Sequence, residues 1–388
     1  MPEKLNVLLV VPWDQESGGV AAVVGYLARH LEGQGHRVLF LNPGSSESVV
    51  RKTTKWGFPG VELKLRVPFN PAFPRRSVLS FLLMFPLTMF RLARLIVQHD
   101  IRLVNVHYPG EQFIYFAVCR WLMRIRLVVS IHGTDAIRWA APSARPSRTL
   151  RMLYRAADLI IAPSWRFLRR CDDVLSSSPA RRLAIHNGTD VAELELSGPD
   201  ISGIDEPYIL SVCSLDPWKG VDVLIRAAAL LRDAAQPVRI VVAGEGPQRV
   251  ELERLIADLG LQDAVHLIGK QPHPVIAKLM HRCSLFVLAS RFETFGIAAL
   301  EAMACGKTVI GTAVDGILEI VEDGENGFVV PPDDPSALAG AIHVLLEDKP
   351  LRERLGAAAR ARVREQFQRD QMGDNYLHAF REVLTSGA

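Results

Sequence analysis

The chain has 388 residues, more than one ordinary hydrophobic core requires, and this length predicts two domains. Its 49% hydrophobic and 22% charged residues are typical of a globular protein and exclude a disordered or fibrous one. Residues 1–190 contain 26 lysines and arginines against 13 acidic residues, a net charge of +13, whereas residues 191–388 carry −10. The two halves are therefore predicted to be electrostatically different domains.

The five cysteines are scattered and form no C-x-x-C pair of the kind used for zinc or redox chemistry. We expect buried thiols in a reducing compartment, at Cys119, Cys171, Cys213, Cys283 and Cys305. The apolar run near the amino terminus is too short for a signal peptide, and no small-residue cleavage site follows it. We therefore expect residence in the cytosol.

The first half alternates short apolar runs with segments of helical period. Residues 5–11 read as a strand, followed by a glycine-bearing loop that ends in Gly18 and Gly19 and by a helix over 20–32. The amides of the two glycines are suited to contact a phosphate or a sugar. Further strands are predicted at 36–41, 102–108 and 126–132. This alternation predicts a parallel sheet covered by helices.

Val78–Phe90 is apolar on all sides and is flanked by four arginines, Arg75, Arg76, Arg91 and Arg94. Its 13 residues fall short of the roughly 17 that span a bilayer, and Pro86 interrupts the run. We favour a buried helix, the usual place for so short a run. A membrane-surface helix with snorkelling arginines is the alternative.

His132 and Asp135 follow the strand-like run RLVVSI, at the carboxyl end where ligands of open sheets collect. A histidine there is either a structural group or a reactive one, and the residues leave both open. Residues 187–207 then contain glycines, prolines and acids without periodicity, as a linker does. We place the domains at 1–190 and 191–369, and expect a last helix within about 350–385, with 370–388 packing back on the first domain.

The strand-and-helix pattern restarts at Tyr208 and predicts a second parallel-sheet domain. Lys219 lies between a strand and a helix, where its charge can reach a phosphate. Gly244 and Gly246 form a strand-to-helix turn that lets a ligand approach the backbone. Each of these signals is weak by itself, because a solvated lysine or a glycine turn is common at such connections.

The strongest signal is a pair of carboxylates eight positions apart, Glu293 and Glu301. A strand ends just before them and a helix is predicted from near Gly296, so Glu293 lies on the loop and Glu301 on the first turns. If both were helical they would be about 12 Å apart, a span suited to a sugar and a ribose at the two ends of a diphosphate. Acids are common at helix starts for dipole reasons alone, but this pairing at the carboxyl end of a strand favours a ligand site.

The start of that helix offers a second feature, the backbone amides of the first turn. Phe295, Gly296 and Ile297 contribute donors that lack partners within a helix. Because the helix macrodipole favours an anion at this end, we predict that these residues bind a diphosphate.

The order of these motifs resembles that of the retaining GT-B glycosyltransferases of glycosyltransferase family four, over nearly the whole chain. The matching segments are SGGVAAVVGYLARHLEGQGHRV, IHGTD, HNGTD, KGVDVLIRA, AGEGP, ETFGIAALEAMACG and ENGFVV. The resemblance implies an α/β fold of two Rossmann-like domains facing each other across a cleft, the first on the acceptor side and the second binding a nucleotide sugar.

The resemblance also implies a role for each site residue. Glu293 would meet the sugar hydroxyls and Glu301 the ribose, while Lys219 and Gly19 would approach the diphosphate and His132 the transferred sugar. The expected catalytic residues are His132, Glu293 and Lys219. The expected donor-binding residues are Gly18, Gly19, Lys219, Gly244, Gly246, Glu293, Phe295, Gly296, Ile297 and Glu301.

Three positions depart from the family pattern. No arginine lies between Tyr208 and Trp218, where many relatives place a second cation for the diphosphate. Thr308 stands where proline is usual, and Asp315 stands where the first glycine of a pair is usual. The Asp315 change touches a donor-side loop and leaves the donor open.

The chain contains no D-x-D triplet, and we expect no metal and no cofactor beside a UDP- or GDP-sugar co-substrate. Lys219 and the helix-start amides would stabilise the leaving diphosphate. The first loop reads ESGGV and lacks the G-x-G-x-x-G of a dinucleotide oxidoreductase. Retention without a protein nucleophile is implied by the resemblance.

We expect a glycan or lipid-linked acceptor in cell-surface polysaccharide or glycolipid synthesis, and no nucleic-acid partner. The alternatives are a soluble small-molecule acceptor and a non-catalytic nucleotide-sugar-binding relative. The charge of +13 also predicts peripheral attachment to the anionic inner face of the cytoplasmic membrane, since each basic residue near it contributes on the order of 1 kcal/mol.

Overall fold

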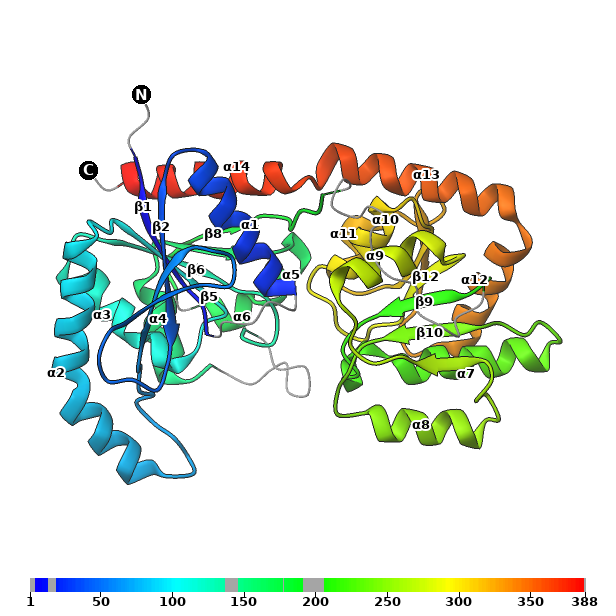
Figure 1. The fold of residues 1–388 in the computed structure, drawn as a ribbon, viewed down its shortest axis with the longest axis horizontal. Coiled ribbons are helices and arrows are strands. Elements are labelled where there is room, and N and C mark those ends of the chain that lie inside the picture. The colour runs from blue at the N-terminus through cyan, green and yellow to red at the C-terminus, as the bar shows by residue number, and fades with distance from the viewer. Residues whose placement is uncertain (1–3, 13–18, 137–145, 177, 191–205, 387–388) are drawn as a thin grey trace. The chain divides into compact units, whose positions relative to one another are not determined.

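The computed structural model describes residues 4–12, 19–136, 146–176, 178–190 and 206–386 (Figure 1). Gly18 lies outside the described residues, and nothing in the fold bears on its predicted role. The chain forms two compact units, Met1–His186 with Asp370–Ala388, and Asn187–Arg369. Each unit is built around one sheet with helices on both faces.

In the first unit, the described strands form an eight-stranded sheet in the order β3-β4-β2-β1-β5-β6-β7-β8, parallel except for the β3–β4 pair. The strands are β1 (Asn6–Val10), β2 (Arg37–Pro43), β3 (Val50–Thr53), β4 (Pro59–Leu63), β5 (Leu103–His107), β6 (Arg126–Ser130), β7 (Leu159–Ala162) and β8 (Arg181–Ala184). The helices are α1 (Gly19–Gly33), α2 (Pro74–Gln98), η1 (Glu111–Phe113), α3 (Ile114–Leu122), α4 (Arg148–Ala156), α5 (Trp165–Arg170), α6 (Asp172–Leu175) and α14 (Arg369–Thr385). The predictions for β1, β2, β5 and β6 are confirmed, whereas β3, β4, β7 and β8 were not predicted.

In the second unit, six described strands form an all-parallel sheet in the order β11-β10-β9-β12-β13-β14. The strands are β9 (Ile209–Val212), β10 (Ile240–Ala243), β11 (Val265–Leu267), β12 (Leu285–Leu288), β13 (Val309–Thr312) and β14 (Gly327–Val330). The helices are η2 (Pro217–Lys219), α7 (Val221–Asp233), α8 (Arg249–Asp258), α9 (His273–Arg282), α10 (Ile297–Ala304), α11 (Ile317–Ile320), α12 (Pro335–Glu347) and α13 (Lys349–Gln366). The predicted α/β class with parallel sheets is therefore confirmed in both units.

The second unit shows why such short apolar runs form strands. Ile209 and Leu210 are neighbours in β9, yet they belong to separate hydrophobic clusters on the two faces of the sheet. Both are almost wholly buried. Because successive side chains of a strand point to opposite faces, a strand covered by helices on both sides must be apolar throughout.

The carboxyl-terminal segment is two helices and not the one predicted over about 350–385. α13 ends at Gln366 and α14 begins at Arg369. Between them the backbone leaves the helix to pair with the segment at Thr189, whose amide donates to the carbonyl of Phe367 at 3.0 Å. This extended pairing takes the place of helical hydrogen bonds and explains the break.

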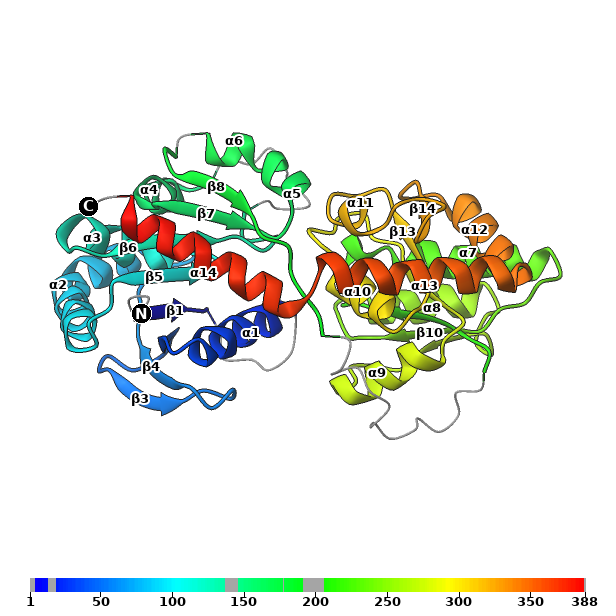
Figure 2. The same cartoon turned by 90° about the horizontal axis from the view of Figure 1, so that it is seen from above.

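α14 packs within the first unit, where Figure 2 shows it beside α1 and over the region of β5 and β6. His30 on α1 lies 2.9 Å from Asp374, and Arg181 on β8 lies 2.8 Å from Glu382. A side chain at position 373 would collide with the His30 ring, because a Cβ on Gly373 would lie 2.3 Å from it. The helix therefore sits tightly against α1.

The prediction that Val78–Phe90 is a buried helix is wrong. The segment belongs to the 25-residue helix α2, and Pro86 lies inside that helix. Leu82, Leu83 and Phe90 are 62%, 68% and 63% exposed. Among the described helices α2 alone is long and apolar enough to cross a membrane, by length and composition only.

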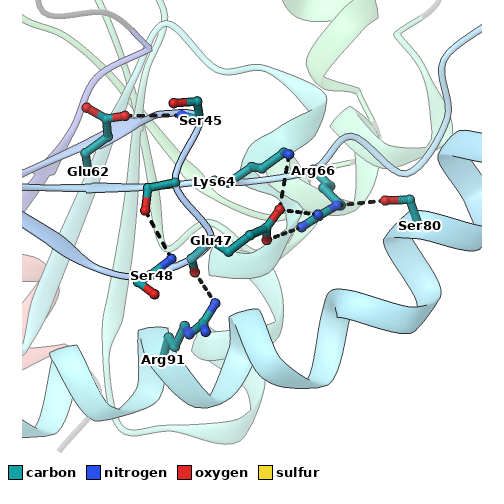
Figure 3. A network of polar contacts seen from close by, with 9 residues as sticks. Ser45, Glu47, Ser48, Glu62, Lys64, Arg66, Ser80 and Arg91 are labelled. Atoms are coloured by element: carbon teal, nitrogen blue, oxygen red, sulfur yellow. Dashed lines mark hydrogen bonds and ion pairs between the residues drawn. The ribbon is translucent and has the colours of Figure 1, made fainter.

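Polar contacts of Ser80 and Arg91 hold one flank of α2 to the loop after β2 (Figure 3). Glu47 pairs with Lys64 at 3.1 Å and with Arg66, which donates to the hydroxyl of Ser80 on α2 at 2.8 Å. Arg91 on α2 also donates to the carbonyl of Glu47. The helix is fastened along this side, which leaves its apolar stripe turned outward.

Candidate functional site

The loop after β9 brings Lys219 to the carboxyl edge of the second sheet. Gly220 follows it with a positive φ of 63°, and a Cβ there would lie 2.0 Å from the carbonyl oxygen of Ala289. Only glycine fits this close approach. The short helix η2 is thereby pressed against the end of β12, the strand that leads to Glu293.

Lys219 and Glu293 form an ion pair, with 2.6 Å between Nζ and Oε2. Their side chains are only 18% and 12% exposed. Burial by itself would lower the pKa of Lys219, but the neighbouring carboxylate of Glu293 outweighs burial and raises it. The lysine is therefore charged at neutral pH, and two predicted site residues from separate loops lie in direct contact.

Arg291 holds these two loops together and was not predicted. Its guanidinium contacts both carboxylate oxygens of Asp222 at 2.8 Å, Asp333 at 2.6 Å and the carbonyl of Pro217 at 2.7 Å. Its amide donates to the carbonyl of Trp218 at 2.8 Å. A bidentate arginine–carboxylate pair of this kind fixes orientation as well as charge. The position of Lys219 relative to Glu293 therefore depends on Arg291.

The helix α10 begins as predicted, directly after a glycine. Gly296 has a φ of 94°, which favours glycine, and its carbonyl accepts from Leu300 at 3.0 Å. Phe295 is buried in the core and Ile297 is the first helical residue. The amide of Gly316 donates to the carbonyl of Glu293 at 2.9 Å, which ties the loop before α10 to α11.

Glu301 lies on α10 with a side chain 14% exposed, and its Oε1 is 3.2 Å from Nε2 of His273. His273 begins α9 and was not predicted. Glu293 lies on the loop and Glu301 on the helix, so the two carboxylates sit on the elements where the sequence placed them.

Gly244 and Gly246 have a packing role that explains their presence. A Cβ on Gly244 would lie 1.8 Å from the carbonyl oxygen of Cys213, and one on Gly246 would lie 2.6 Å from the backbone of Leu215. The turn therefore packs directly on the loop that leads to Lys219. Burial raises the pKa of the Cys213 thiol to about 11, although the charge of Lys219 opposes the rise.

One of the departures from the family pattern, Thr308, has a local explanation. Thr308 is buried, and its hydroxyl donates to the carbonyl of Arg352, so that threonine fastens α13 where proline has no donor. Asp315 is half-buried and adjoins Gly316, where a Cβ would lie 2.2 Å from the backbone of Phe295. Gly316 is the second glycine of the usual pair, and the packing at this position requires glycine.

In the first unit, His132 follows β6 in a loop shaped by Asp135. The carboxylate of Asp135 accepts from the amide of His132 at 3.0 and 3.1 Å and from the amide of Gly133. Burial raises the pKa of Asp135 to about 7, against the effect of these hydrogen bonds. Gly19, at the start of α1, is exposed.

The ring of His132 contacts a second histidine that was not predicted. Its Nε2 lies 3.1 Å from Nδ1 of His107, and the two rings stack with centroids 5.3 Å apart. Burial lowers the pKa of His132 to about 4 and that of His107 well below its usual range. Both rings are therefore neutral at pH 7. The available signal was the pair of polar residues, Asn105 and His107, within the otherwise apolar strand β5.

The remaining predictions concern metal and thiols. Within the described ranges, no group of three or more histidine, cysteine, aspartate and glutamate side chains is placed to hold a metal ion. The five cysteines are thiols, and all but Cys213 are buried.

Comparison with known proteins identifies the family. Residues 17–193 match the family described as Glycosyltransferase Family 4, and residues 199–362 match the one described as Glycosyl transferases group 1. Together with the two parallel-sheet units, these matches define a glycosyltransferase of the GT-B class. The chain belongs to glycosyltransferase family four.

Individual relatives agree with this assignment. D-inositol 3-phosphate glycosyltransferase 1 of Catenulispora acidiphila is 30% identical over 72% of each chain. Alpha-D-kanosaminyltransferase of Streptomyces kanamyceticus is 36% identical, but the alignment spans only 46% of the length of that relative. Among solved structures, Anabaena HepE in complex with UDP has a TM-score of 0.76 at 21% identity, covering 97% of this chain and 100% of that chain, which supports the fold.

Proposed function

We propose that the protein is a retaining glycosyltransferase that moves a sugar from a UDP- or GDP-sugar to a glycan or lipid-linked acceptor, in the synthesis of cell-surface polysaccharide or glycolipid. The observation that carries the proposal is the Lys219–Glu293 pair, 2.6 Å apart, on the loops beside the helix that bears Glu301. The family matches and the UDP bound by the Anabaena protein of the same fold support a nucleotide-sugar donor.

The chemistry requires positive charge at the diphosphate, because this leaving group gains negative charge as its bond to the sugar breaks. Lys219 is charged and its side chain is only 18% exposed, so it is suited to stabilise that charge electrostatically. The first turn of α10 adds the positive end of a helix dipole. These groups can carry the leaving group without a metal ion.

The two carboxylates would hold the two ends of the donor. Glu293 would accept from the sugar hydroxyls and Glu301 from the ribose hydroxyls. In the proposed step the sugar–diphosphate bond breaks and the bond to the acceptor oxygen forms on the same face of the sugar. The acceptor proton passes to the diphosphate, and no protein nucleophile takes part.

The test is a panel of UDP-, GDP- and ADP-sugars, with calorimetry for binding and NMR for slow donor hydrolysis and the anomer released. We expect one donor to bind and to hydrolyse with retention in excess EDTA, and Glu301→Ala to lose binding while remaining folded. Binding without turnover would indicate a non-catalytic relative. Loss of activity in EDTA that magnesium or manganese restores would contradict the metal-independent step.

We further propose that the protein is cytoplasmic and attaches peripherally to an anionic membrane surface through α2. The apolar residues Leu79, Leu83, Phe90 and Val97 recur every four to seven positions along one face and are 60–72% exposed. Arg75, Arg76 and Arg94 are exposed beside them. An apolar helix face with flanking arginines is suited to lie at the headgroup boundary of an anionic bilayer. A lipid-linked acceptor would be available at that surface.

A further inference from the structure

A line of buried polar side chains joins the carboxyl-terminal helix to His132 inside the first unit. The ring of Tyr376 on α14 packs against that of His107 with centroids 6.5 Å apart, and its hydroxyl lies beside Ser130, whose Oγ is 3.0 Å from Oδ1 of Asn105. Nδ2 of Asn105 lies 2.9 Å from Nε2 of His107, and Nδ1 of His107 lies 3.1 Å from Nε2 of His132. The three central members are fully buried, and Tyr376 is 2% exposed.

The orientation of the Asn105 amide fixes the direction of the hydrogen bonds along this line. The amide oxygen of Asn105 can only accept, so Ser130 donates its one hydroxyl proton to it and is left able only to accept from the Tyr376 hydroxyl beside it. The amide nitrogen can only donate, so Nε2 of His107 accepts and the proton of this neutral ring lies on Nδ1. That proton is donated to Nε2 of His132. A neutral His132 therefore carries its own proton on Nδ1.

We propose that Tyr376, Ser130, Asn105 and His107 are positioning residues that fix the orientation and the Nδ1–H tautomer of His132, so that this histidine acts as a hydrogen-bond donor. The inference deepens the proposed function and rests on it, with His132 at the transferred sugar as the family resemblance implies. It also gives α14 a function, because Tyr376 lies on this helix. In the sequence Tyr376 follows His132 by 244 positions.

The surroundings support a directed arrangement and not merely a filled core. Burying polar groups is costly unless each is satisfied, and apolar side chains would fill β5 as well as Leu103, Val104 and Val106 do. The ring of Tyr376 is itself held edge-on by Phe380, with centroids 5.9 Å apart. The strand therefore retains two polar residues where stability alone does not require them.

The first test reads the tautomer directly and needs no activity. The protein is labelled with ¹⁵N-histidine, and the ring nitrogens of His132 and His107 are assigned with His132→Asn and His107→Asn. We expect the protonated nitrogen to be Nδ1 in both rings at pH 7. A proton on Nε2 of His132 would overturn the proposal, whether or not the protein proves to be a glycosyltransferase.

The second test uses variants that interrupt the line. Tyr376→Phe keeps the buried ring and removes the hydroxyl, and we expect kcat for donor hydrolysis to fall roughly fivefold, as for one lost hydrogen bond, while KM stays within about twofold. Asn105→Val removes the donor to His107, and we expect a mixture of tautomers at His132 and a larger loss of kcat. If Asn105→Val does not fold, Tyr376→Phe decides the test.

The matched control is Tyr208→Phe. Tyr208 is also 2% exposed, and its hydroxyl donates to the carbonyl of Leu279 at 2.9 Å in the second unit, away from the proposed site residues. It should lose similar stability and keep kcat and both histidine tautomers. Equal kcat in Tyr376→Phe and wild type, or an equal loss in Tyr208→Phe, would reject a positioning role for Tyr376.

Discussion

The Lys219–Glu293 pair shows that a sequence motif can indicate a candidate site residue but cannot show which other residues it contacts. Both residues stand in motifs that follow a strand, and the roles predicted for them rest on this position. Their contact at 2.6 Å depends on Arg291, whose partners Asp222 and Asp333 are 69 and 42 positions away in the chain. A sequence motif does not show that residues so far apart in the chain are in contact. Asn105 and His107 stand out as polar residues in the apolar strand β5, but their role was missed for the same reason, because the sequence does not show that His132 lies beside His107.

Lys219→Ala is expected to lower turnover by about 10²-fold or more, because the diphosphate would lose the cation proposed to stabilise it. The variant also leaves Glu293 without its partner in a site 12% exposed, so a smaller loss of stability accompanies it. Steady-state kinetics with the identified donor and thermal denaturation measure the two effects. Lys349→Ala is the control, since Lys349 is 70% exposed and pairs only with Glu353 among the contacts described. Turnover within a few-fold of wild type in Lys219→Ala would assign the charge elsewhere.

At the scale of elements, the hydrophobic periodicity of the sequence predicted strands and their connections. It did not predict whether a helix is exposed. Val78–Phe90 was assigned to the core because its composition is apolar. Whether such a helix is covered depends on what packs beside it, and Glu47, Lys64 and Arg66 fasten only one side of α2. The short edge strand β3 and its neighbour β4 were missed because neither contains a continuous apolar run, and the residues of β3 are mostly exposed.

The ion pair of Arg291 with Asp222, which links the end of β12 to α7, gives a prediction at this scale. Asp222→Asn removes the carboxylate that Arg291 grips with two bonds, and we expect about 1–2 kcal/mol of lost stability and a raised KM for the donor. Asp333→Asn removes a partner that is 60% exposed and should cost less than about 0.5 kcal/mol. Chemical denaturation and donor kinetics compare the two. Equal effects of the two substitutions would show that the Arg291–Asp222 pair does not organise the site.

Membrane attachment through α2 is tested by vesicle sedimentation. We expect binding to vesicles that contain anionic phospholipid, weaker binding at high salt, and little binding to neutral vesicles. Leu79→Gln with Leu83→Gln removes two side chains of this face that are 60% and 68% exposed, and should weaken binding roughly 30-fold through lost apolar contact. Leu230→Gln with Val344→Gln, exposed positions of the second unit, should leave binding unchanged. Equal recovery in the supernatant under all conditions would favour a soluble acceptor.

At the scale of the whole molecule, the alternation of strands and helices predicted two parallel-sheet units because this pattern has few other folded solutions. The break between α13 and α14 was not predicted, since it arises from pairing with Thr189, far away in the sequence. The pH dependence of the free energy of unfolding is also a property that no motif predicts. It is set by titratable groups that the fold buries in one protonation state.

The histidine pair sets the expected direction of that dependence. Burial lowers the pKa of His132 from 6.5 to about 4, so between these values the unfolded chain binds a proton that the folded protein does not. Stability contributed by the neutral ring is therefore fully present above pH 6.5 and is lost as the pH falls toward 4. His107 acts in the same direction, because burial lowers its pKa as well. Asp135, with a pKa raised to about 7, acts oppositely in much of this range.

Comparing wild type with His132→Gln separates the histidine from Asp135, whose backbone contacts the variant retains. We expect the stability advantage of wild type over the variant to shrink by on the order of 1–2 kcal/mol between pH 6.5 and pH 4.5, and to stay constant between pH 6.5 and pH 7.5. Urea denaturation at each pH measures it. An advantage that grows on acidification would mean that His132 is protonated in the folded protein. A charged ring would donate from both nitrogens, and the directed line from Tyr376 could then no longer set its tautomer.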